Sequence, residues 1–350
     1  MKIVHYLNHT RRANGHVAVA VDLACEQAKD HEVYVVSAPG DFDELLAENG
    51  VALIHVEDAT GVLRLPLMAI RLFRALRGIR PQIVNAHMVA AALAASIVRP
   101  LLGFKIVTTV HNSFDRQARL MGVGDRVIAV SNSVQDEMRR IGISASKLRT
   151  VTNGTIGGRR RPLLPKCSMM LRHPAVVSVC GLHKRKGVHH LIEAFDAARA
   201  RCPDATLYIV GEGPERLALQ EQADRSSSAA NIHFLGFMED PREVLATAEI
   251  FVLASLRDPY PLVLLEARQM GNAIIASAVD GIPQALNHGQ RGLLVPPGEI
   301  GPLCEALLSL LLDDTSRRRF AAAAAEDIDE IKVARMSAET LDVYEDALLP

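Results

Sequence analysis

The stretch from Ile250 to Ser277, IFVLASLRDPYPLVLLEARQMGNAIIAS, decides the fold class. Both ends are short apolar runs typical of buried strands. The middle is an apolar helical pattern that begins near Pro261, where a helix tolerates a missing N–H. A strand, a helix and a second apolar strand in this order predict a parallel sheet covered on both faces.

Two acids lie in this stretch, eight positions apart: Asp258 in the loop after the first strand, and Glu266 within the helix. A carboxylate in apolar surroundings needs hydrogen-bond donors. The residues alone leave two sources open. An arginine from elsewhere in the chain would make a structural ion pair, whereas the hydroxyls of a ligand, such as a ribose diol, would make a binding site.

The same alternation of apolar strands and helices runs through all 350 residues, 49% of which are hydrophobic. We expect strands at residues 2–7, 31–38, 52–56, 82–87, 105–111, 126–131 and 148–154, and at 175–181, 206–213, 232–236, 250–255, 273–277 and 292–296. The chain is long enough for two domains with separate cores. Its predicted class is therefore α/β, with two doubly wound, Rossmann-like domains.

The segment Gly154–Ser168, GTIGGRRRPLLPKCS, interrupts this alternation. It is rich in Gly, Pro and Arg and has no periodicity, which is typical of a linker. We predict a first domain over residues 1–157, a linker over 158–170 and a second domain over 171–335. The helical segment 336–350 has no strand after it and is free to pack back on the first domain.

The composition excludes few classes of function. Together with the cysteine pattern and the start of the chain, it predicts a cytoplasmic protein. The net charge of −1 gives no sign of a nucleic-acid partner, and we predict none. Five cysteines without a C-x-x-C pair indicate reduced thiols. The start, MKIVHYLNHT, is typical of a first strand rather than a signal peptide. No run reaches the ~20 apolar residues of a membrane span.

Positive charge gathers in one window, because no acid occurs from Ala59 to Phe114. Arg71, Arg74 and Arg77 share one face of a predicted helix at i, i+3 spacing. One interpretation is a peripheral contact with an anionic membrane surface. The other is an ordinary surface helix that packs one face on its own sheet.

The quoted stretch resembles the signature of family-four retaining glycosyltransferases of the GT-B fold. The resemblance lies in an acid followed eight positions later by Glu, inside SLRDPYPLVLLEARQMGNAIIAS. It continues in order through NGHVAVAVDLA, RPQIVNAH, VTTVHNSF, CGLHKRKGVHHLIEAF, LYIVGEGPERLAL, HFLGF and VDGIPQALNHGQRGLLVPPG.

This resemblance implies the GT-B fold, with two facing Rossmann-like domains and a deep cleft between them. It implies transfer of a sugar from a nucleotide-diphosphate sugar to a glycan or lipid-linked acceptor, with retained configuration and without a metal cofactor. Such an acceptor suits cell-surface polysaccharide or lipopolysaccharide biosynthesis. UDP is the family's commonest nucleotide, followed by GDP. The nucleotide would bind mainly to the second domain, and the acceptor mainly to the first.

The resemblance also assigns roles around the helix. Glu266 would accept hydrogen bonds from the ribose, and Asp258 would contact hydroxyls of the donor sugar. The family more often has Glu at the position of Asp258. Backbone N–H groups around Tyr260, Leu262 and Val263 would line the sugar and phosphate, as expected where a helix N-terminus faces an anion.

The loop GLHKRKG, residues 181–187, would bind the diphosphate. Gly181 permits a close backbone approach, and Lys186 matches the family's phosphate lysine. The family usually has an Arg directly after this glycine, where this chain has Leu182, so Arg185 is a weak candidate replacement. A solvated charge run is the alternative. Together, Asp258 and Leu182 put full activity in doubt.

The remaining candidates also follow strands. His111 occupies the family's position for a His beside the donor sugar, where it would orient the sugar and stabilise charge at the anomeric carbon. Gly15 would bring backbone amides to the diphosphate. Gly211 and Glu212 would form a tight turn near the donor, and Phe237 ends the matching HFLGF segment.

Two rival functions stay open. A catalytically weak nucleotide-sugar-binding protein would bind the donor without transferring it. An NAD-dependent oxidoreductase would also use Rossmann-like domains, but the third glycine of G-x-G-x-x-G is replaced by Arg216. A D-x-D at Asp41 and Asp43 precedes a predicted helix, so we interpret it as a helix cap rather than a metal site.

Overall fold

Two parallel sheets form the protein. The computed structural model describes residues 1–12, 14–57, 64–114, 116–161, 164–165 and 169–349. The chain divides into two compact units, the first made of Met1–Arg160 with Asp329–Pro350 and the second of Arg161–Ile328. The predicted linker 158–170 lies partly outside the described residues, as does the start of the basic window at 59–63.

The first sheet has seven strands in the order β3-β2-β1-β4-β5-β6-β7. Its strands are β1 (Lys2–His9), β2 (Glu32–Ala38), β3 (Ala52–His55), β4 (Ile83–Ala86), β5 (Lys105–Val110), β6 (Arg126–Ala129) and β7 (Leu148–Thr150). The helices of this unit are α1 (Gly15–Gln27), α2 (Asp43–Glu48), α3 (Leu65–Leu76), α4 (Val89–Leu102), α5 (Asn132–Arg140) and α13 (Val333–Leu348).

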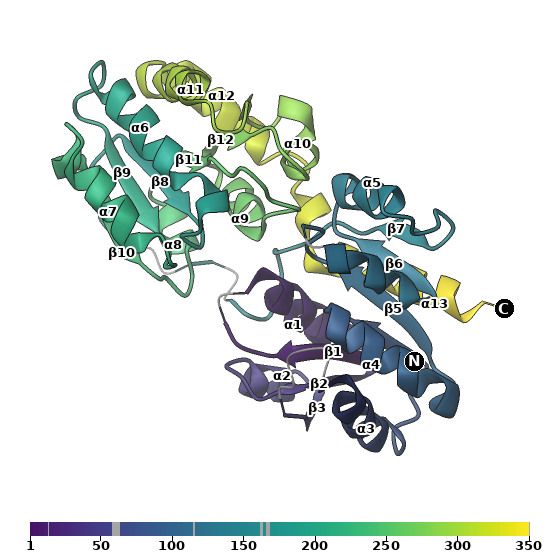
Figure 1. The fold of residues 1–350 in the computed structure, drawn as a ribbon. Coiled ribbons are helices and arrows are strands. Elements are labelled where there is room, and N and C mark those ends of the chain that lie inside the picture. Colours follow the sequence, from purple (N-terminus) through teal and green to yellow (C-terminus); the bar gives the residue numbers. More distant parts are fainter. Residues whose placement is uncertain (13, 58–63, 115, 162–163, 166–168, 350) are drawn as a thin grey trace. The chain divides into compact units, whose positions relative to one another are not determined.

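Helix α13 comes from the far end of the chain, yet it packs on α1, β5 and β6 (Figure 1). Its Tyr344 is fully buried, and Asn85 Nδ2 of β4 donates a hydrogen bond to the Tyr344 hydroxyl at 2.7 Å. The last helix therefore completes the core of the first unit.

The second sheet has six strands in the order β10-β9-β8-β11-β12-β13. Its strands are β8 (Ala175–Val179), β9 (Thr206–Val210), β10 (Ile232–Gly236), β11 (Ile250–Leu253), β12 (Ala273–Ser277) and β13 (Leu293–Val295). The helices are α6 (Val188–Arg199), α7 (Arg216–Asp224), α8 (Arg242–Leu245), α9 (Leu262–Met270), α10 (Ile282–Ala285), α11 (Ile300–Leu312) and α12 (Asp314–Ala324).

The sequence prediction of strands is confirmed, since each of the thirteen expected runs contains a strand. Several strands end before their apolar run does, because the last residues turn into the loop. The quoted stretch forms β11, α9 and β12, and Gly271, at φ +73°, ends α9 so that the chain can return into the sheet.

The strand order of each sheet reverses once, between β1 and β4 and between β8 and β11. In open α/β sheets, ligands bind beyond the carboxyl ends of the strands at such switch points. The loops after these four strands are therefore where a site is expected.

Candidate functional site

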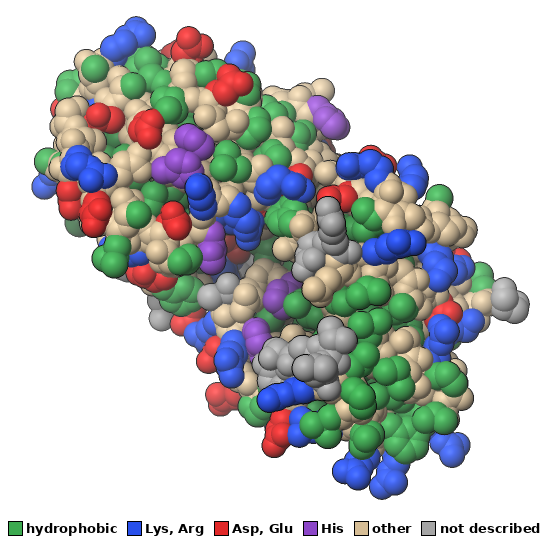
Figure 2. All heavy atoms as spheres, viewed as in Figure 1, with side chains coloured by type: hydrophobic (Ala, Val, Ile, Leu, Met, Phe, Trp, Pro, Cys, Tyr) green, Lys and Arg blue, Asp and Glu red, His purple; other side chains and the backbone are tan. Residues whose placement is uncertain are grey.

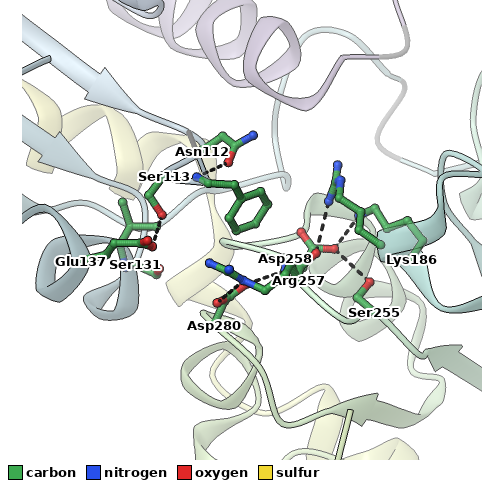
Figure 3. A network of polar contacts seen from close by, with 12 residues as sticks. Asn112, Ser113, Ser131, Glu137, Lys186, Ser255, Arg257, Asp258 and Asp280 are labelled. Carbon is green, nitrogen blue, oxygen red and sulfur yellow. Dashed lines mark hydrogen bonds and ion pairs between the residues drawn. The ribbon is translucent and has the colours of Figure 1, made fainter. Parts of the chain in front are cut away.

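In the second unit, the loops after β8 and β11 bring a cation and a carboxylate together. Asp258 is 4% exposed, although it lies in a loop. Lys186 Nζ donates to Asp258 Oδ2 at 2.5 Å, and Ser255 Oγ donates to the same oxygen at 3.2 Å (Figure 3). Lys186 supplies the opposite charge that a buried carboxylate requires.

Backbone hydrogen bonds join the same two loops. Leu256 N donates to Arg185 O at 2.7 Å, and Arg185 Nη1 donates to Arg257 O at 3.2 Å. Asp280, after β12, accepts from Asp258 N at 2.7 Å and pairs with Arg257 at 3.0 Å (Figure 3). The loops are thus held in one arrangement without a ligand, which lowers the entropy cost of binding.

Two glycines allow these loops to touch backbone to backbone. A Cβ at Gly187, which has φ +65°, would lie 2.0 Å from Ala254 O. A Cβ at Gly211, at φ +129°, would lie 1.9 Å from Cys180 O. Only glycine fits at either position, and the tight turn expected at Gly211 and Glu212 stays a prediction.

Leu182 stands where the family usually has an Arg, and the structure shows the environment of its side chain. Leu182 is 0% exposed and belongs to the core of the second unit. The leucine therefore contributes packing to this loop, and the basic side chains of the loop are those of Lys184, Arg185 and Lys186.

Glu266 lies one turn into α9 and is 4% exposed. Arg161 Nη1 donates to its Oε1 at 2.5 Å. The same guanidinium lies 3.5 Å from Asp240, which Arg242 also binds at 2.6 Å. Burial acts to raise the pKa of Asp240, but the hydrogen bonds from Arg242 and the charge of Arg161 outweigh it, so that this pKa is lowered.

Arg161 is the arginine that the sequence left open as an alternative for Glu266. The ion pair does not exclude a ribose site, because a diol offers the same donors to the carboxylate. A ribose bound at Glu266 would have to compete with Arg161 for Oε1.

The other donor-site candidates of the second unit lie around these loops. Tyr260 is buried, and Leu262 and Val263 form the first turn of α9, whose leading N–H groups have no intrahelical partner. Glu212 is exposed, and its carbonyl accepts from Leu182 N at 2.9 Å. Phe237 follows β10 and is 53% exposed.

In the first unit, His111 follows β5, and its Nε2 lies 3.0 Å from Nδ1 of His87 after β4. Burial, with the nearby His16, lowers the pKa of His111 to about 3. The next residues turn sharply, as Phe114 N donates to the Asn112 side chain at 2.9 Å (Figure 3). Gly15 is exposed and begins α1.

Comparison with known proteins decides the family. The family model "Glycosyltransferase Family 4" matches residues 13–155, and the model "Glycosyl transferases group 1" matches residues 173–313.

The chain is a family-four glycosyltransferase.

Curated relatives of this glycosyltransferase include a glycogen synthase of Mycobacterium tuberculosis. It is 29% identical over 293 residues, which span 75% of this chain and 69% of the relative. An alpha-maltose-1-phosphate synthase of Mycolicibacterium smegmatis is 27% identical over 305 residues, spanning 75% of this chain and 78% of the relative. The chain is therefore an enzyme of the glycosyltransferase class.

A solved structure of Anabaena HepE in complex with UDP has a TM-score of 0.83 at 19% identity, covering 99% of this chain and all of that one. WaaG, a glycosyltransferase involved in lipopolysaccharide biosynthesis, has a TM-score of 0.74 at 17% identity, covering 97% of this chain and 99% of that one. These similarities confirm the GT-B fold.

Sequence reasoning missed several residues that contact the candidate site residues. Arg161 and Asp280 were not singled out, the first because it lies in an apparent linker. His87 carries the same signal as His111, since both follow apolar strands. His5 lies inside β1, and its pairing with Asn85 of β4 becomes visible only in the sheet register.

The helix-cap interpretation of Asp41 and Asp43 is wrong. Phe42 is the N-cap of α2. Asp43 accepts from Thr10 Oγ1 at 2.5 Å and Gly40 N at 3.2 Å, while Asp41 accepts from Arg12 N at 2.8 Å. Both acids thus hold the loop after β1. Within the described ranges, no group of three or more His, Cys, Asp or Glu is placed to hold a metal ion.

The basic helix is α3, and its three arginines differ. Arg71 pairs with Glu57, a residue just outside the acid-free window, whereas Arg74 and Arg77 are exposed. Leu67 and Ile70 of α3, with Ile97 and Leu101 near the end of α4, are large exposed hydrophobics. Figure 2 shows hydrophobic side chains gathered over α3 and α4, with basic side chains at their edge. No helix in the described part of the chain is long and apolar enough to cross a bilayer.

Proposed function

We propose that this glycosyltransferase moves a sugar, with retained configuration, from a UDP-sugar to a glycan or lipid-linked acceptor of cell-surface polysaccharide or lipopolysaccharide biosynthesis. The observation that carries the proposal is the buried pair of Lys186 and Asp258 at the switch point of the second sheet, beside the N-terminus of α9.

The donor diphosphate is assigned to Lys186. A phosphate is a stronger partner for this ammonium than a single carboxylate, because it offers more charge and more acceptor oxygens. Its arrival releases Asp258 from Lys186 and frees the carboxylate to bind sugar hydroxyls. Lys186, with Arg185 nearby, then stabilises the charge that grows on the departing diphosphate, so we propose that no metal is required.

The ribose is assigned to Glu266, which supports UDP binding through two charge-assisted hydrogen bonds. Arg161 occupies Glu266 in the absence of donor and remains paired with Asp240 when the ribose displaces it. Both Arg161 and Glu266 then keep a partner, so replacing Arg161 by the ribose costs little free energy.

Retention of configuration is explained if the acceptor oxygen attacks the anomeric carbon from the same face from which the diphosphate leaves. The anomeric carbon–oxygen bond to the diphosphate breaks, the acceptor oxygen bonds to that carbon, and the acceptor proton passes to the departing phosphate oxygen. This route needs no pair of carboxylates acting as acid and base. His111 orients the sugar and stabilises charge at the anomeric carbon.

The assignment of UDP and of the acceptor class draws on related proteins. HepE has been solved with UDP and with UDP-glucose. A lipopolysaccharide core glycosyltransferase of Rhizobium meliloti is 30% identical over 155 residues, and a phosphatidyl-myo-inositol mannosyltransferase of Mycolicibacterium smegmatis is 34% identical over 164 residues. A lipid-linked acceptor fits the exposed apolar and basic face of α3 and α4, which we propose rests on the inner face of the plasma membrane.

The test begins with a thermal-shift screen of the full chain against UDP, GDP, ADP and their sugars. Tight binding to the folded state raises the melting temperature by mass action. Transfer or hydrolysis of the best donor, labelled in its sugar, is then measured.

Glu266→Ala should lower kcat/KM by about 10²-fold or more, because a site built to bind hydroxyls loses its acceptor. Glu305→Ala, an exposed acid on α11, is the control. Donor binding without transfer or hydrolysis would favour the non-catalytic binder, and a response to NADH instead of UDP would favour the oxidoreductase.

A further inference from the structure

Three histidines form a continuous hydrogen-bonded chain inside the first unit. His111 Nε2 lies 3.0 Å from His87 Nδ1, and His87 Nε2 lies 3.0 Å from His5 Nδ1. The chain ends on Gln27 of α1, whose Oε1 lies 2.9 Å from His5 Nε2. The rings of neighbouring histidines are stacked, with centroids 5.3 Å apart in both pairs.

These histidines are neutral. His5 and His87 are 0% and 2% exposed. Burial lowers the pKa of His5 to about 4, against the hydrogen bond that Gln27 Oε1 accepts from the ring, which acts to raise it. Burial also lowers the pKa of His87, aided by His111, His5 and His16. The ionisable groups that act on His111 and its neighbour His16 are themselves histidines, His16 and His9, and no carboxylate of the described residues is among them.

In a chain of neutral histidines, all the hydrogen bonds must be donated in the same direction along the chain. Gln27 Oε1 can only accept, so His5 Nε2 carries the proton and donates to it. A neutral ring has one N–H, which leaves His5 Nδ1 as an acceptor, and His87 Nε2 must donate to it. The same step repeated gives His111 an Nε2–H that donates to His87, and leaves Nδ1 of His111 without a proton.

The direction is set by Gln27, because its amide oxygen Oε1, and not its Nε2, lies against His5 Nε2. The Nε2 atom is buried and makes no hydrogen bond with a described residue. The two substitutions at Gln27 described below therefore test the orientation of this amide together with the direction of the chain.

We propose that Gln27, His5 and His87 are positioning residues that hold His111 as its Nε2–H tautomer, with Nδ1 ready to accept a hydrogen bond from a hydroxyl of the bound sugar. The proposal rests on the proposed function, in which His111 orients the donor sugar. It adds the tautomer, the atom that faces the substrate and the residues that fix both.

The tautomer can be measured directly in the full chain without any donor. Histidine labelled with ¹⁵N gives different two-bond ¹H–¹⁵N correlation patterns for Nε2–H and Nδ1–H rings. His5→Asn and His111→Asn assign the signals. The expected result at pH 7.5 is His111 in the Nε2–H form. An Nδ1–H form, or a rapidly exchanging mixture, would overturn the proposal.

Two substitutions at Gln27 test the direction. Gln27→Leu removes the acceptor, so His111 should become a mixture of tautomers. Gln27→Glu keeps an acceptor-only group, so His111 should remain Nε2–H while the pKa of His5 rises. Thr109→Val is the matched control, because Thr109 bonds Asn85 at 2.9 Å and does not contact the chain through a hydrogen bond. An unchanged His111 in Gln27→Leu would also contradict the proposal.

Activity supplies an independent readout. Gln27→Leu should lower kcat/KM by about tenfold, the value of one hydrogen bond at the sugar. The acid limb of its pH profile should move up, because a released His111 titrates nearer its ordinary pKa. The tautomer result stands whether or not transfer is detected, so failure of the proposed function and failure of this inference are distinguishable.

Discussion

The two units meet the demand for polar groups at a sheet edge in opposite ways. In the second unit, the carboxyl groups of Asp258 and Glu266 are each paired with a basic side chain, Lys186 or Arg161. In the first unit, His5, His87 and His111 are neutral groups that hold one another. The side chains of the second unit can thus exchange one charged partner for another. Those of the first unit form a chain in which each hydrogen bond fixes the direction of the next.

This difference matches the two parts of a nucleotide sugar. In the function proposed above, a diphosphate and a ribose replace a charged partner: the phosphate replaces Asp258 at Lys186, and the diol replaces Arg161 at Glu266. A neutral sugar hydroxyl needs instead a donor or an acceptor whose direction is already fixed. The four predictions below test this division, beginning with the largest effect.

Lys186→Met should lower kcat by about 10²- to 10³-fold, because it removes a charge that stabilises the departing diphosphate. It should also destabilise the second unit, since Asp258 is left buried without a cation. Steady-state kinetics and thermal unfolding measure the two effects. The control is Lys184→Met, an exposed lysine in the same loop. Adding Asp258→Asn should restore stability but not activity; recovered activity would refute the phosphate role.

Acid should destabilise the first unit before the second. The folded pKa of His5 is about 4, below its ordinary 6.5. The unfolded chain therefore binds more protons between these values. The stability is fully present above pH 6.5 and is lost as pH falls through about 4, at a cost of about 3 kcal/mol from His5 alone.

Scanning calorimetry from pH 7 to 4.5 measures this loss, with the second unit's transition identified by its response to UDP. His16, whose pKa burial also lowers to about 4, adds to the effect. A first-unit transition that does not move would contradict the neutral state of the histidines.

The exposed arginines of α3 should contribute to membrane binding in unequal amounts. Arg74→Ala and Arg77→Ala should each weaken binding to vesicles containing anionic lipid by about 1 kcal/mol. Arg71→Ala is the internal control, because Arg71 is already paired with Glu57 and should matter less. Vesicle sedimentation measures the binding. Equal effects at all three sites would show that this ion pair opens at the lipid surface.

Arg161→Ala should tighten UDP binding by about fivefold, because the ribose no longer competes with an arginine for Glu266. Isothermal titration calorimetry measures the change, and the exposed Arg159→Ala is the neighbouring control. Weaker binding of UDP would mean that Arg161 belongs to the ribose site itself, and the exchange proposed for Glu266 would be wrong.

Local patterns predict much of this molecule. Apolar runs predict the strands, and the order of short motifs predicts the family, because both depend on neighbouring residues. Predictions are least reliable where the environment of a residue is formed by residues distant in the sequence. Leu182 follows Gly181 in a loop, and nothing in the neighbouring residues shows that its side chain contributes to a core formed by several elements.

Long-range partners are the other source of failure. Arg161 and Glu266 are 105 positions apart in the sequence. Arg161 lies in a segment without a repeating hydrophobic pattern, so the sequence gives no sign of this contact. The histidine chain joins residues separated by 82 and 24 positions, and it exists only because β1 lies between β2 and β4 in the sheet. Asp43 was assigned to a local cap but binds Thr10 instead. Sequence identifies each group, and the strand order determines what it meets.

The passage of α13 into the first unit has a consequence for synthesis. The second unit is one unbroken segment, whereas the first is encoded in two pieces, with that segment inserted between them. A ribosome therefore finishes the second unit while the first still lacks the helix that bears Tyr344. A stop codon that removed the segment of α13 would leave the residues of the second unit in place. It would destabilise the first unit, which would lose the helix that completes its core.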